Sequence, residues 1–151
     1  MPVHEALAAK ERTQEAHRHL LTGLKYIADD KLDWVPMGSA KTPRQIALEC
    51  ATAYKLTGQL IRGEMPEWAP PDPAAYPTRE SVVAALDAAL ADLFSTLDAL
   101  TSEQLAEKRQ APWGETTVGE TIWMAFWHSV YHDGQLNYIQ TLLGDTEMHF
   151  E

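Results

Sequence analysis

Apolar residues recur at alternating steps of three and four positions along four stretches of the chain. This spacing limits the possible folds more than any other feature, because it places an apolar stripe on one side of a helix. The clearest stripe is Val83, Leu86, Leu90, Leu93, Leu97 and Leu100. No segment alternates convincingly with a period of two, as a half-buried strand would. The sequence therefore predicts an all-α protein.

Start and stop signals divide the chain into four expected helices. They run over about Val3 to Ala28, Pro43 to Arg62, Arg79 to Leu100 and Val118 to Leu143. Thr42 is placed to cap the second helix, with Pro43 at its first position, and Thr78 is placed to cap the third. Gly144 is expected to end the fourth.

The segments between these helices differ in character. Residues 29–41, DDKLDWVPMGSAK, form a loop, and residues 63–77, GEMPEWAPPDPAAYP, are too proline-rich for a helix and predict an extended crossover. Residues 101–108 predict a short helical turn, and 109–116, RQAPWGET, an irregular piece. Together these elements predict a four-helix bundle with a long crossover connection, in a single domain over residues 1–151.

Composition excludes several kinds of partner. The net charge is −10 and lysine and arginine form no run, which argues against nucleic acid and against an anionic membrane surface. No apolar stretch approaches the ~20 residues of a membrane span, and the charged amino end does not resemble a secretory signal. Cys50 is the only cysteine, so no intramolecular disulfide can form, as expected of a cytoplasmic protein.

Two of the predicted stripes contain polar residues that could bind a metal. The second helix gives Ile46, Glu49, Ala53, Leu56 and Leu60, and the fourth gives Ile122, Ala125, Ser129, His132, Leu136, Ile139 and Leu143. His128 lies one turn before His132, ~40° around the helix. A buried carboxylate needs a partner, and two histidines at i and i+4 can share one cation with it. The spacing favours a site of Glu49, His128 and His132 with open coordination positions.

Other interpretations of the same residues remain open at this stage. The two histidines could be a hydrogen-bonded core pair, and Glu49 could pair with a lysine or arginine or reach water at a bundle end. His17 could line the same cavity, or it could be an exposed polar residue. Tyr131 and Gln135 could line the pocket or support the ligands, or could simply pack and cap local backbone.

Two blocks of sequence resemble a known family over essentially the whole chain. The segments "TPRQIALE" and "TTVGETIWMAFWHSVYHDGQLNYIQTLLGD" are similar to the DinB-like superfamily, also described with the YfiT-type metal-dependent hydrolases. The resemblance implies a four-helix bundle with a divalent metal held by three histidines. His128 and His132 fall on two of these positions, and Glu49 stands at the third. Cys50 is a neighbouring alternative, ~100° away on the helix.

The resemblance also implies a class of chemistry. Members with a known activity use low-molecular-weight thiols, as S-transferases or a thiol-dependent isomerase. The metal would be zinc, nickel, iron or manganese, and a carboxylate ligand favours the last two. It could lower the pKa of bound water to about 7 or activate a thiolate. We expect a metal-dependent S-transferase or hydrolase acting on a small electrophile. The alternative is a non-catalytic bundle that binds an apolar small molecule or a partner, with a degenerate or structural metal site.

The fourth predicted helix is apolar well beyond its stripe. Its additional large side chains are Trp123, Met124, Phe126, Trp127, Val130, Tyr131 and Tyr138. They could wall a ligand pocket, form a two-fold interface, or be covered by loops such as EMPEWAPPDP. The family resemblance favours a homodimer through this helix.

Overall fold

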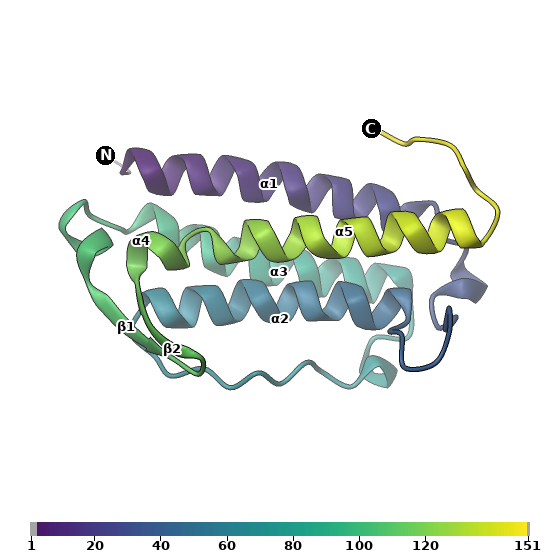
Figure 1. The fold of residues 1–151 in the computed structure, drawn as a ribbon, viewed down its shortest axis with the longest axis horizontal. Helices are drawn as coiled ribbons and strands as arrows, with labels where there is room; N and C mark the ends of the chain where they lie inside the picture. The colour runs from purple at the N-terminus through teal and green to yellow at the C-terminus, as the bar shows by residue number, and fades with distance from the viewer. Residues whose placement is uncertain (1–2, 151) are drawn as a thin grey trace.

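The computed structural model describes residues 3–150 and consists mainly of four long helices (Figure 1). These are α1 (His4–Lys25), α2 (Pro43–Ile61), α3 (Arg79–Asp98) and α5 (Met124–Leu142). The prediction of an all-α four-helix bundle is confirmed. The domain predicted over residues 1–151 includes Met1, Pro2 and Glu151, which lie outside the described residues.

The helices run in two directions. In Figure 1, α1 and α5 run from left to right, and α2 and α3 run from right to left. Because α2 and α3 are parallel neighbours, the chain must return along the whole bundle between them, and residues 62–78 make this crossover. The helix α2 packs against both α3 and α5, and α1 packs against α5 and α3.

The predicted caps are present. Thr42 accepts a hydrogen bond from the backbone N–H of Gln45, whose side chain accepts one from the backbone N–H of Thr42. Thr78 makes the same reciprocal arrangement with Ser81 at the start of α3. Such boxes satisfy amide groups that the first helical turn leaves without partners. Gly144 follows α5 with a φ of 98°, a conformation that suits glycine.

The segment around residue 112 differs from the prediction. Strands β1 (Lys108–Ala111) and β2 (Gly114–Thr117) form an antiparallel hairpin where an irregular piece was expected. Period-two alternation is absent because Ala111 is the one fully buried residue of the two strands. Backbone pairing and Arg109, which donates hydrogen bonds to the carbonyl oxygens of Leu60 and Ile61 at the end of α2, hold the hairpin in place.

The fourth predicted helix is divided in two. A short α4 (Val118–Thr121) precedes α5, and the backbone tightens between them, where Trp123 N donates to Glu120 O at 3.4 Å. The apolar stripe continues across this break, since Ile122 and Ala125 are both buried. The first and third helices end at Lys25 and Asp98, slightly before their predicted ends.

The described part of the chain also contains three single turns of 3-10 helix, η1 (Asp29–Lys31), η2 (Pro73–Ala75) and η3 (Glu103–Ala106). The last lies where a short helical turn was predicted. The stripe of α3 is buried from Leu86 onward, but Val82 rather than Val83 is its fully buried first member. Within residues 3–150, every helix is too short or too polar to cross a bilayer.

Candidate metal centre

Two adjacent residues of α2 have side chains that could bind a metal. Glu49 and Cys50 lie about two turns after the Thr42 cap, and only 7% of Glu49 and none of Cys50 is exposed. Both are buried because α2 is covered by α5 on one side and by α3 on the other. The helix therefore presents a carboxylate and a thiol to the interior of the bundle.

The helix α5 supplies the two histidines. His128 and His132 are one turn apart, and their ring centroids lie 4.4 Å from each other. Their ligand nitrogens and the Cys50 sulfur all lie within 4.8 Å of one another. The structure thus brings together Cys50, His128 and His132 at the α2–α5 interface.

Glu49 contacts two residues at this site, His132 and Lys41. Its Oε2 lies 3.5 Å from His132 Nε2, and its Oε1 lies 2.5 Å from the ammonium nitrogen of Lys41. Lys41 directly precedes the cap of α2, in a loop without periodic pattern, so sequence spacing gave no signal for it. The salt bridge was one of the interpretations left open for Glu49, and it occurs here together with the contact to His132.

The hydrogen bond of His132 leaves its second ring nitrogen free to accept. His132 Nδ1–H donates to Gln135 Oε1 at 2.6 Å, because an amide oxygen can only accept. Its Nε2 therefore carries a lone pair. His128 Nε2 is buried and has no hydrogen-bond partner. A buried ring nitrogen without a partner is costly, and in the tautomer protonated at Nδ1 its lone pair could bind a cation. The donor set therefore fits a divalent metal.

Burial favours the metal-binding, neutral form of the two histidines, but it favours the protonated thiol of Cys50. It lowers the pKa of His128 to about 4, with His132 and Lys41 adding to the effect. Burial also lowers the pKa of His132, although Gln135 and Glu49 oppose this shift. Both imidazoles are therefore neutral at pH 7, as coordination requires. The pKa of the Cys50 thiol is raised by burial and by the Glu49 and Asp133 carboxylates.

A pocket opens beside His132. Its volume is about 720 Å³, and it lies between the loop before α2, the start of α2 and the second half of α5. Tyr131 and Gln135, both predicted to belong to the site, line it together with His132 and Lys41. The other walls are mainly apolar and include Trp34, Pro36, Met37, Ile46, Tyr138, Ile139 and Leu142. A small organic molecule in this pocket would contact one cationic side chain and one histidine.

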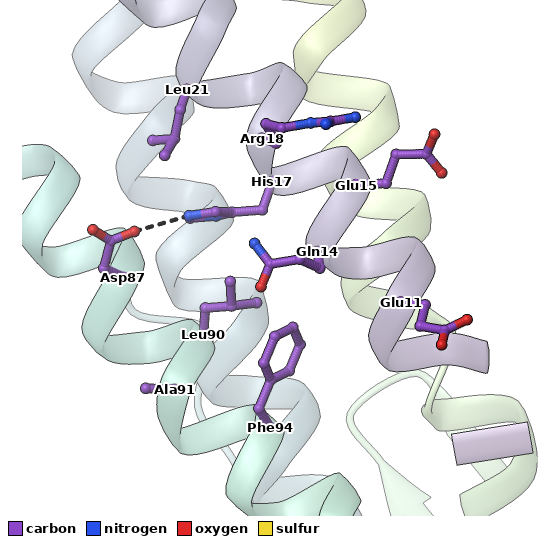
Figure 2. Close-up of a pocket in the computed structure, with 10 residues that line it drawn as sticks. All are labelled: Glu11, Gln14, Glu15, His17, Arg18, Leu21, Asp87, Leu90, Ala91 and Phe94. Carbon is purple, nitrogen blue, oxygen red and sulfur yellow. Dashed lines mark hydrogen bonds and ion pairs between the residues drawn. The ribbon is translucent and has the colours of Figure 1, made fainter. Parts of the chain in front are cut away.

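His17 lies in a different part of the bundle. Figure 2 shows it in a cleft between α1 and α3, pointing at Asp87, to which His17 Nε2 lies at 2.9 Å. This cleft has a volume of about 570 Å³ and is lined by residues of α1 and α3 alone. His17 is buried, rather than exposed as one interpretation held, and it does not line the pocket at His132.

Sequence comparison places the chain in a family. The model of the DinB superfamily matches residues 9–136. The chain belongs to this superfamily. The predicted resemblance is thereby confirmed. Among the curated proteins, none matches the chain significantly.

Solved structures share the fold at low sequence identity. YjoA, a DinB-like protein from Bacillus subtilis, is 18% identical with a TM-score of 0.74, over 95% of this chain and 96% of that one. YfiT from Bacillus subtilis, described as a probable metal-dependent hydrolase with an unusual four-helix bundle topology, is 20% identical with a TM-score of 0.62, over 92% and 87%. A mycothiol-dependent maleylpyruvate isomerase is 12% identical with a TM-score of 0.65, over 87% and 60%. These likenesses show the DinB-type bundle.

Proposed function

We propose that this protein is a divalent-metal-dependent enzyme, an S-transferase that uses a low-molecular-weight thiol or a hydrolase, acting on a small electrophilic molecule. The observation that carries the proposal is the pair of neutral histidines one turn apart, His132 buried beside an apolar pocket and His128 with a buried Nε2 that has no partner. His128 and His132 would hold the cation together with a donor from α2, for which Glu49 and Cys50 are the candidates. The descriptions of YfiT and of the mycothiol-dependent isomerase support this class of chemistry.

When bound, zinc, nickel, iron or manganese would act as a Lewis acid toward a nucleophile or an electrophile in the pocket. The chain's own residues provide binding and orientation. Gln135 holds the His132 ring through its Nδ1, and the largely apolar walls keep water from a bound substrate. Lys41, half-exposed at the pocket, places an ammonium where it can bind an anionic group of a substrate or thiol.

Elemental analysis of protein purified without chelator or a histidine tag tests the proposal. We expect about one transition metal per chain in the wild type and none in His132→Ala, because that substitution removes a ligand. His149→Ala is the matched control, since His149 pairs with Asp145 and does not belong to the group of clustered ligand atoms. A wild type that takes up no metal, even after dialysis against zinc, nickel, manganese and ferrous iron, would refute the enzyme proposal and favour a non-catalytic binding protein.

We also propose a homodimer through the outer face of α5. Trp127, Tyr131 and Tyr138 are each 65% exposed and lie along one side of the helix. Tyr131 and Tyr138 also line the pocket, so a second copy would contribute to closing it. Light scattering after size exclusion should give a dimer for the wild type and a monomer for Trp127→Glu with Tyr138→Glu. A monomeric wild type at micromolar concentration would exclude the dimer.

A further inference from the structure

We infer that Cys50, and not Glu49, is the donor from α2, so that the centre consists of one thiolate and two imidazoles. This inference rests on the proposed metal dependence and specifies its ligands. The DinB resemblance implies three histidines, and the sequence pattern favoured a carboxylate in place of one of them. The geometry of the side chains points to a third arrangement.

The position of the sulfur is the first argument. Cys50 Sγ lies within 4.8 Å of the ligand nitrogens of both histidines, so a single cation could contact all three after small side-chain rotations. Cys50 is fully buried, and His132 is almost fully buried. The Nε2 atom of His128, which has no hydrogen-bond partner, is buried too. All three donors therefore meet in a region from which water is largely excluded.

The partners of Glu49 are the second argument. Its Oε1 is held by the Lys41 ammonium at 2.5 Å, so the carboxylate already has a counter-ion. Its Oε2 lies 3.5 Å from His132 Nε2, and the group of ligand atoms within 4.8 Å of one another includes Cys50 instead of Glu49. Coordination by Glu49 would weaken the salt bridge to Lys41, whereas coordination by Cys50 leaves it intact.

Binding by Cys50 has a definite proton balance. The thiol S–H bond breaks, a bond between sulfur and the metal forms, and one proton leaves to the solvent, while the neutral imidazoles lose none. A thiolate ligand shifts the preference from manganese or iron toward zinc, which accepts sulfur and nitrogen readily. Three protein donors would leave the fourth coordination position of the metal open. Glu49 would remain next to the metal site, held by its salt bridge to Lys41.

Cobalt absorption distinguishes these ligand sets without any assay of activity. Thiolate bound to Co²⁺ gives a charge-transfer band in the near ultraviolet, which imidazole and carboxylate ligands do not give. The metal-free protein is titrated with Co²⁺ in the presence of a phosphine reductant, so that no added thiol contributes. Because Cys50 is the only cysteine, any such band comes from it.

We expect the band in the wild type and in Glu49→Gln, and its complete loss in Cys50→Ser. The serine variant should also bind Co²⁺ at least about tenfold more weakly. Cobalt binding by the wild type without the band would overturn the inference while leaving the proposed metal dependence intact. No cobalt binding by the wild type would overturn both. The wild-type spectrum decides by itself, should Cys50→Ser fail to fold.

Discussion

The bundle contains buried histidines in two regions, and their hydrogen bonds differ. In the α1–α3 cleft, both ring nitrogens of His17 have partners, Asp87 Oδ1 at 2.9 Å and the Tyr54 hydroxyl at 3.2 Å. At the α2–α5 interface, His128 Nε2 has no partner within residues 3–150, and His132 Nε2 faces a carboxylate oxygen at 3.5 Å. A histidine with two partners is stabilised by the protein alone. A histidine with a bare buried nitrogen is completed by a further donor or cation.

This difference shows that burial by itself does not identify a metal ligand. His17 and His132 are each 3% exposed, and burial lowers the pKa of both. What separates them is the direction in which the second nitrogen points. The His17 ring spans from Tyr54 to Asp87 and supports packing between three helices, whereas the rings on α5 point at donors on α2.

The largest expected effect is on the response to zinc. Zinc in about 100-fold excess over its dissociation constant should raise the melting temperature of the wild type by roughly 5–10 °C. His17→Gln should keep this rise and His128→Gln should lose it, because only the second removes a proposed ligand. Differential scanning fluorimetry measures both. Equal responses in the two variants would contradict the distinction between the two regions.

An intermediate effect is expected from Tyr54→Phe. The Tyr54 hydroxyl lies between His17 Nδ1 at 3.2 Å and Ser129 Oγ at 2.8 Å, so its removal leaves the buried His17 Nδ1 without a partner, while Ser129 still donates to the Ala125 carbonyl oxygen. The free energy of unfolding should fall by about 1–3 kcal/mol in urea titrations. Tyr131→Phe is the control, since Tyr131 is 65% exposed and should change stability by less than about 0.5 kcal/mol. No loss in Tyr54→Phe would mean that the bonds of His17 are not stabilising.

The smallest effect concerns pH. Burial lowers the pKa of His17 below 6.5 in the folded protein, although its hydrogen bond to Asp87 opposes the shift. The unfolded chain therefore takes up a proton first, and the stability due to neutral His17 is lost as the pH falls from 6.5 through the lower folded pKa. In protein kept metal-free with a chelator, the free energy of unfolding should fall less between pH 7 and pH 5 for His17→Gln than for the wild type, as measured by urea titration at each pH. If the variant loses as much stability in acid as the wild type, protonation of His17 does not contribute to the pH dependence of the free energy of unfolding.

The sequence predicted the elements of the fold well where periodicity and capping act together. Thr42 and Thr78 cap their helices as expected because the cap is a local arrangement of four residues. The hairpin at 108–117 was missed because its strands are held by backbone pairing and by Arg109, and neither leaves an apolar pattern. The stripes placed Glu49 and His132 inward, and both are buried.

The site was harder to predict than the fold. The position of Cys50, ~100° from Glu49 on an ideal helix, suggested a side chain directed elsewhere. In the bundle α2 is covered by both α3 and α5, so two neighbouring faces of this helix are buried. The face that carries Cys50 also lies against the two histidines of α5. The role of Lys41 depends on how the loop before α2 folds back on Glu49.

By itself, the sequence determined the helices, their inward stripes and the presence of two histidines one turn apart, because these depend on spacing along a single helix. Only the tertiary structure decided which side chains meet. In the folded chain His17 pairs with Asp87, away from the other two histidines. Glu49 forms a salt bridge with Lys41, and Cys50 lies beside His128 and His132 on α5. The contacts of His17 and Cys50 join residues far apart in the chain, and that of Glu49 depends on how the loop before α2 folds; no periodic pattern encodes the geometry of either.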